Sequence, residues 1–328
     1  MYPEPTSHAS ATPSPPSPFP APPPQEFSVP TTRRRFDWKR FLLLCGAIGL
    51  IASGGIGMLL YLGFSYGLGA TIVGLIGAIL PVPILVSVFV WLDRFQPEPW
   101  KYLAFCFGWG ACVATALALA VNTGASVALR VSGESDTHVA TLVAPFIEEI
   151  GKAIGPLLLY FFRRRIFNGP IDGIVYFGLS AIGFAMMENI LYMGGVYLQG
   201  SAMTGLAAVG ALNVVVLFIV RVILTGFAHP LFTVMTGIAV GFAARSNNRL
   251  VRWLLPLSGL LVAMMLHGTW NLMATLGQFS AWVLLYGYFG LMIPIFYAVV
   301  GLTLWLRTGD SRIIARVLPT YVDAAWIS

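Results

Sequence analysis

Three ionisable side chains interrupt a segment that is otherwise apolar from residue 139 to about residue 161. They are Glu148, Glu149 and Lys152. A helix of roughly 20 residues crosses a bilayer, and a charge near its centre costs at least about 2.5–3.5 kcal/mol. On such a helix Lys152 lies one turn beyond both carboxylates, so it can neutralise either of them but not both fully. One carboxylate is therefore left for another partner or for proton transfer from water.

Further polar residues interrupt three other apolar runs. Glu188 is followed by Asn189, His229 stands alone, and His267 has Asn271 one helical turn later. At about 1.5 Å per residue, Glu188, His267 and Glu148 would lie about 12–14 Å from the outer ends of their helices, and His229 about 8 Å. Because ionisable groups inside a membrane are functional candidates by default, this shared depth predicts one site in the outer half of the bilayer.

Each of these groups also has a purely structural interpretation. Glu149 and Lys152 can form an ion pair between helices, and Glu188 with Asn189 can join helices by hydrogen bonds. Either histidine can simply donate to a neighbouring carbonyl group. The coincidence of depth on four helices favours a common site over four independent contacts.

The composition predicts an all-α, polytopic transmembrane bundle. With 57% hydrophobic and 10% charged residues, the chain has too little polar surface for a soluble globule. The net charge of +6 comes from arginine clusters at the ends of apolar runs, as at cytoplasmic flanks, and does not indicate a nucleic-acid partner. Spans are expected at about 41–62, 70–92, 102–129, 139–161, 172–196, 224–244, 253–275 and 282–305.

Charge decides the topology where hydropathy is ambiguous, between residues 204 and 244. One span at about 224–244 keeps Arg245, Arg249 and Arg252 on the same side as the other arginine clusters, whereas two spans would place them outside. We therefore predict eight spans in the cell membrane with both termini cytoplasmic. The stretch 204–223 would be a re-entrant or outer-surface helix, or an extension of the sixth span.

Three regions follow from this topology. Residues 1–40 form a Pro-rich tail, expected to be disordered, that ends in a basic flank. Residues 41–306 form the transmembrane core, and residues 307–328 form a short cytoplasmic tail.

The motifs of the core, taken in order, resemble the PrsW family of intramembrane proteases, within the superfamily that includes the type II CAAX prenyl endopeptidases. They are Glu148-Glu149-x-x-Lys152, Phe184-x-x-x-Glu188-Asn189, His229 and His267-x-x-x-Asn271, preceded by a similar loop from Asp93 to Pro99. The similarity covers about residues 80–275. The wider superfamily usually has arginine after the paired glutamates and histidine in the second motif, where this chain has Lys152 and Glu188.

The resemblance implies an intramembrane endopeptidase that cuts a single-pass membrane protein, such as an anti-sigma factor, near the outer face. By the same resemblance Glu148 is the expected base, with His267 and Asn271 orienting water and oxyanion. Glu149, Glu188 and His229 would complete the catalytic set, supported by Lys152 and Asn189.

Zinc is the competing means of activating water. Glu148, Glu188, His229 and His267 could ligate Zn²⁺, which would lower the pKa of a bound water to near 7. No His-Glu-x-x-His run is present, so only the composition of the site indicates a metal. No cofactor is certain from the sequence, and we favour glutamate-activated water.

Two other functions fit the same residues. A proton- or ion-coupled transporter could relay ions through the glutamates and histidines, although the inverted repeats typical of transporters are not evident. A catalytically inert membrane scaffold that binds the same substrates is the third possibility.

Overall fold

The computed structural model describes residues 38–132 and 137–323, and every regular element in these two ranges is a helix. The all-α class is therefore confirmed. Residues from Leu44 onward form one compact unit. The predicted disordered tail, apart from its last residues, lies outside the described part of the chain.

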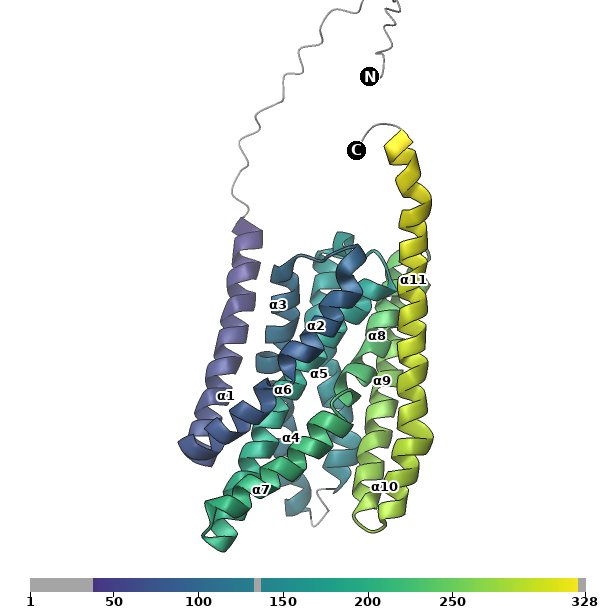
Figure 1. Cartoon of the computed structure of the whole chain (residues 1–328). Coiled ribbons are helices and arrows are strands. Elements are labelled where there is room, and N and C mark those ends of the chain that lie inside the picture. The colour runs from purple at the N-terminus through teal and green to yellow at the C-terminus, as the bar shows by residue number, and fades with distance from the viewer. Residues whose placement is uncertain (1–37, 133–136, 324–328) are drawn as a thin grey trace, which may run out of the picture. The chain divides into compact units, whose positions relative to one another are not determined.

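The first two predicted spans are formed by α1 (Trp38–Ile79) and α2 (Val82–Leu92). α1 consists of two helices joined at Gly67, where φ is +75°, a value that glycine adopts without the steric cost of a Cβ. The part of α1 after this kink and α2 together correspond to the second predicted span (Figure 1).

The next two predicted spans agree with the observed helices to within a few residues. They comprise α3 (Trp100–Gly108), the π-helix η2 (Trp109–Ala114), α4 (Thr115–Val131), the π-helix η3 (Val139–Val143) and α5 (Ala144–Phe162). The short 3-10 helices η1 (Asp93–Phe95) and η4 (Arg164–Ile166) follow α2 and α5.

The central helix is α6 (Pro170–Thr204), which is longer than predicted and buried over most of its length. Pro170 starts it, where a missing N–H costs nothing, and Gly205 ends it in the left-handed conformation. α6 packs closely against α8 (Ala228–Arg245) because two glycines face each other: a Cβ on Gly173 would overlap the carbonyl oxygen of Gly237. Small residues of this kind let membrane helices approach closely.

The ambiguous stretch between residues 204 and 244 contains two helical segments. α7 (Ala207–Phe218) and the π-helix η5 (Ile219–Leu224) precede a break at residues 225–227, after which α8 begins. α7 packs on α6 at Gly200 and Gly210, and it runs obliquely to α8 (Figure 1). The stretch is thus a helix leading into α8 through a break.

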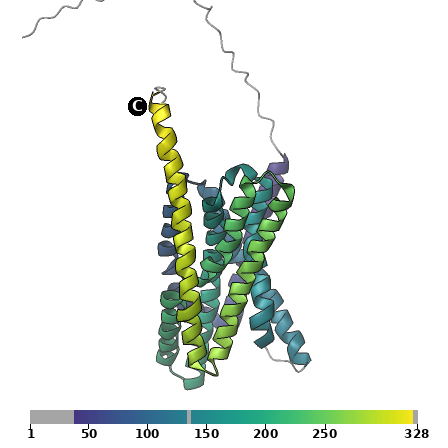
Figure 2. The ribbon, with the colours of Figure 1, turned by 90° about the vertical axis from the view of Figure 1, so that its right-hand side faces the viewer.

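The last two predicted spans are α9 (Arg249–Gly277) and the series α10 (Ala281–Gly287), η6 (Tyr288–Met292) and α11 (Ile293–Asp323). α11 continues as a helix beyond residue 307, where we predicted a separate tail (Figure 2). The predicted region 307–328 is therefore helical as far as the structure describes it.

The arginine-bearing loops meet at one end of the compact unit. Arg164 donates to the carbonyl of Ala244 at 3.3 Å, and Arg245 donates to that of Asn168 at 2.6 Å. We call the part formed by residues 163–169 and 245–252 the arginine-rich end. Its assignment to the cytoplasmic side follows from the positive-inside rule and stays a prediction.

The loop from Asp93 to Pro99 is anchored at the N-terminal part of α6. The backbone N–H of Glu98 donates to Asp93 Oδ2 at 2.6 Å, and the hydroxyl of Tyr176 donates to the Glu98 carboxylate. Partial burial raises the pKa of the Glu98 carboxyl to about 7. The charge of Glu98 in this contact with Tyr176 therefore changes near neutral pH.

Six helical stretches in the described residues are long and apolar enough to cross a membrane. The first, Phe41–Phe95, contains two of the predicted spans, while α5 carries three ionisable residues near its middle. The chain is a multi-pass membrane protein, and the count of eight spans stays a prediction.

Candidate active site

Lys152 is the centre of a buried network that joins α5 to α6 and α8. Its side chain is inaccessible to solvent, and its Nζ lies 2.8 Å from Glu149 Oε1 and 3.6 Å from Glu148 Oε2. Nζ also lies 3.0 Å from Nδ1 of His229 and 4.1 Å from the centre of the Phe184 ring. An ammonium group can only donate, so His229 Nδ1 accepts here and its proton is on Nε2.

Glu149 is fully engaged. Its Oε1 receives the Lys152 contact and lies 3.0 Å from His267 Nδ1, while its Oε2 accepts a hydrogen bond from Thr233 at 2.8 Å. With Nδ1–H of His267 donating to this carboxylate, the Nε2 lone pair of His267 is left free. Glu149 therefore balances the positive charge of Lys152 and fixes the orientation of the His267 ring.

Glu148 is the carboxylate that remains available. Its Oε2 is buried without a hydrogen-bond partner and lies 3.7 Å from His267 Nε2. The side chain borders a cavity of about 230 Å³ whose lining also includes Glu188 and Asn122. Of the paired glutamates, Glu148 is thus the one with an oxygen free of hydrogen bonds on a side chain beside a cavity, and its availability for chemistry stays a prediction.

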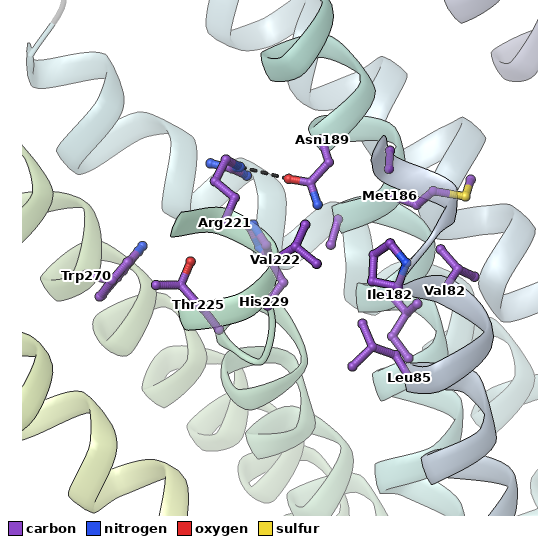
Figure 3. A pocket seen from close by; sticks show the side chains of 15 residues that line it. Val82, Leu85, Ile182, Met186, Asn189, Arg221, Val222, Thr225, His229 and Trp270 are labelled. Atoms are coloured by element: carbon purple, nitrogen blue, oxygen red, sulfur yellow. Dashed lines mark hydrogen bonds between the residues drawn. The ribbon is translucent and has the colours of Figure 1, made fainter. Parts of the chain in front are cut away.

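Glu188 forms a second polar group around His229. Its Oε2 lies 2.7 Å from His229 Nε2 and 2.5 Å from Arg221, whose Nε donates to Asn189 Oδ1 at 2.8 Å. Figure 3 shows Asn189, Arg221 and His229 around a smaller pocket of about 40 Å³, with the Arg221 to Asn189 hydrogen bond dashed. Glu188 and Asn189 are therefore held by an arginine from η5.

The family model for PrsW family intramembrane metalloproteases matches residues 98–299, which include every residue of these networks. The chain belongs to the PrsW family. It is therefore an intramembrane protease, a hydrolase of peptide bonds, and this match favours that function over the transporter and scaffold alternatives.

Three curated relatives carry the name Protease PrsW. The protein from Geobacillus kaustophilus is 27% identical over 197 residues, covering 59% of this chain and 76% of the relative. That from Clostridioides difficile is 26% identical over 193 residues, covering 58% and 75%, and that from Bacillus subtilis is 30% identical over 152 residues, covering 46% and 60%. No solved structure matches this chain.

The PrsW family is described as a metalloprotease family, so the donors must be tested against a metal. Glu148, His229 and His267 each present one ligand atom within 4.8 Å of the others. The unpartnered Glu148 Oε2 and the free Nε2 of His267 suit zinc, and Glu149 supports His267 as a second carboxylate commonly supports a zinc-binding histidine. The donor set therefore fits, provided that His229 releases Lys152 or Glu188.

Two predicted site residues have other contacts. Glu188, which we included among possible zinc ligands, is paired with Arg221 and His229 and lies outside that group of three. Asn271 donates its amide to the backbone carbonyl of Ala140 at 2.8 Å and fixes η3 to α9. The described contacts thus do not bring Asn271 to the carboxylates.

Sequence reasoning missed three residues that hold the network. Arg221 is absent from the residues predicted above, although a lone arginine in a long apolar run is a usable signal. Thr233 bonds Glu149, and the ring of Phe232 stacks on His267 with centroids 5.1 Å apart. Threonine and phenylalanine are common in membrane helices, so nothing in the sequence distinguished these two.

Proposed function

We propose that this protease hydrolyses a peptide bond of a single-pass membrane protein in the outer half of the bilayer, with Glu148 acting on the attacking water. The observation that carries the proposal is the unpartnered Oε2 of Glu148 at a cavity, surrounded by charges that are already paired. A general base must lie within hydrogen-bond reach of its water, and Oε2 of Glu148 is a buried carboxylate oxygen without a hydrogen-bond partner, on a side chain that borders the cavity.

The neighbours of Glu148 support this role. His267, with Nδ1–H directed at Glu149, presents Nε2 toward the same space and can accept a hydrogen bond from the water. A zinc ion held by Glu148, His229 and His267 would supply a bound water with a pKa near 7. Glu149 holds His267 in place under either route.

The reaction then follows general acid–base logic. Glu148 takes a proton from water as the oxygen attacks the peptide carbonyl, and the same carboxyl group returns the proton to the departing nitrogen. The cavity beside Glu148 and Glu188 is the place where a peptide bond would reach the water. The resemblance to the family favours an anti-sigma factor as substrate.

The first prediction concerns Glu148→Gln, which keeps the shape of the side chain and removes the base. We expect cleavage of a captured membrane substrate to fall by about 10²–10⁴-fold, with folding and substrate binding retained. Crosslinking in cells with the Glu148→Gln variant should trap the substrate, and the purified wild-type protein should then cut it in proteoliposomes.

Chelation distinguishes the two ways of activating water. Loss of cleavage with a strong chelator, restored by zinc, would assign the metal route, whereas unchanged cleavage would assign glutamate alone. Full activity of the Glu148→Gln variant would contradict both.

A further inference from the structure

A further polar pocket lies at the arginine-rich end, away from the candidate active site. It is a cavity of about 280 Å³ between the end of α5 and the beginning of α9. Its lining contains three arginines and three aromatic residues: Tyr160, Phe161, Arg164, Arg249, Arg252 and Trp253. No acidic residue is among them.

The arginines of this pocket are not neutralised by carboxylates. Arg164 and Arg252 donate to the backbone carbonyls of Ala244, at 3.3 Å, and Ser246, at 2.8 Å. In the described part of the chain no ion pair joins either of them, or the exposed Arg249, to an acidic residue. The pocket therefore concentrates positive charge that an anion could satisfy.

The position of these charges on α9 adds to the argument. Arg249 and Arg252 are in the first turn of this helix, which contains no acidic residue. The positive end of a helix dipole favours anions and disfavours cations, so two arginines there are unfavourable unless an anion lies nearby. The same dipole would strengthen the binding of that anion.

The aromatic side of the pocket indicates a lipid. Phe161 and Trp253 stack with ring centroids 5.2 Å apart, and their exposed fractions are 50% and 66%. Exposed apolar side chains continue from the pocket along α9, at Leu250, Leu254 and Leu257. Tryptophan is enriched where membrane meets water, and a free phosphate ion would leave this apolar surface unused.

We propose that this pocket binds the phosphate headgroup of an anionic phospholipid, with the guanidinium groups on the phosphate and an acyl chain along α9. Basic pockets between transmembrane helices on the cytoplasmic side take such headgroups, and arginine pairs with phosphate through two parallel hydrogen bonds.

The pocket connects the two helices that carry most of the candidate active site. α5 holds Glu148, Glu149 and Lys152, and α9 holds His267. Arg252 and His267 are separated by about 22 Å along α9, at 1.5 Å per residue. A bound lipid would therefore brace α5 against α9 without touching the reacting groups.

The test uses full-length purified protein and two phospholipids with the same acyl chains, phosphatidylglycerol and phosphatidylcholine. Native mass spectrometry should show preferential retention of phosphatidylglycerol. Arg249→Gln should weaken that retention about tenfold, the effect of losing one charge-assisted contact. The control is Arg312→Gln, which removes the same charge from an exposed position on α11 and should change nothing.

Equal weakening by Arg249→Gln and Arg312→Gln, or no preference between the lipids, would overturn the proposal. The side chain of Arg249 makes no hydrogen bond or ion pair in the described residues, so its variant should keep the wild-type unfolding temperature. If it does not fold, Trp253→Ala serves as the second variant and should weaken phosphatidylglycerol retention. A competition experiment with inorganic phosphate completes the test. Displacement of the lipid by millimolar phosphate would show that the site binds free phosphate instead.

Discussion

Glu148 and Glu149 are adjacent in the sequence, yet their surroundings give them different tasks. Glu149 has both carboxylate oxygens engaged, by Lys152, His267 and Thr233, whereas Oε2 of Glu148 has no hydrogen-bond partner. Successive residues of a helix point about 100° apart. Both carboxylates lie near Lys152 and His267, but Glu149 also reaches Thr233 of α8, whereas the Glu148 side chain borders the cavity lined by residues of α4 and α6. The division between a holding carboxylate and an available one follows from that geometry.

Arg221 is the residue whose role is most directly open to test. It pairs with Glu188, donates to Asn189 and lies over the face of the Tyr192 ring. We expect Arg221→Gln to lower kcat about 10–100-fold, as loss of a supporting contact does, because Glu188 would no longer hold His229. Arg221→Lys should restore part of the rate, since it returns the charge.

Kinetics on the captured substrate would check this positioning role. The expected signature is a lower kcat with little change in KM, together with a shifted pH profile of kcat. Unchanged kinetics for Arg221→Gln would show that Glu188 is held without the arginine.

At the scale of elements, the position of α6 depends on small residues at its crossings. Gly173 and Gly237 allow α6 and α8 to approach backbone to backbone, and Gly183 does the same against the carbonyl of Phe107 in α3. α6 carries Glu188 and α8 carries His229, so the 2.7 Å contact between these two side chains depends on a close helix pair.

Gly173→Ala is expected to force α6 and α8 apart. The added Cβ would overlap a backbone oxygen that cannot move away as a flexible side chain would, so we expect a loss of about 1–3 kcal/mol in stability. Thermal unfolding in detergent measures it. The matched control is Gly301→Ala in α11, where nothing lies within 4 Å of the added atom, and there helix propensity predicts no loss. Equal unfolding temperatures for the two variants would contradict the close packing.

At the scale of the whole molecule, the distribution of arginines predicts on which side of the membrane the candidate active site lies. The arginine-rich end contains the loops after α5 and α8, and the candidate active site lies further along the same helices. If that end is cytoplasmic, the site lies in the outer half of the membrane. The orientation therefore decides from which side a substrate is cut.

Cysteine labelling tests this orientation in intact cells, in a background without Cys45, Cys106 and Cys112. A cysteine at Asn247 should be shielded from an impermeant thiol reagent, because positive loops stay inside. A cysteine at the exposed Gln278, between α9 and α10, should react. Labelling at Asn247 with protection at Gln278 would reverse the topology.

The sequence by itself determined the class of the molecule and most of its candidate site. Apolar runs of membrane length have few alternatives to helices, since every backbone polar group in lipid must be satisfied internally. The cost of burying ionisable groups identified Glu148, Glu149, Lys152, Glu188, His229 and His267 as exceptions that needed a reason. The family motifs then suggested a common chemistry for these residues. The family match confirmed that the chain is an intramembrane protease, and the roles of the individual residues stay a prediction.

The tertiary structure decided the contacts that cross between helices. Sequence spacing limits which residues share a face of one helix, but it carries no information on which faces meet. Only the packing of the helices shows that Thr233 donates to Glu149, that Arg221 forms an ion pair with Glu188, and that Asn271 donates to the backbone carbonyl of Ala140. Hydropathy could not predict the break before α8 or the helical continuation beyond residue 307. An apolar run has the same hydropathy whether its helix is straight or interrupted.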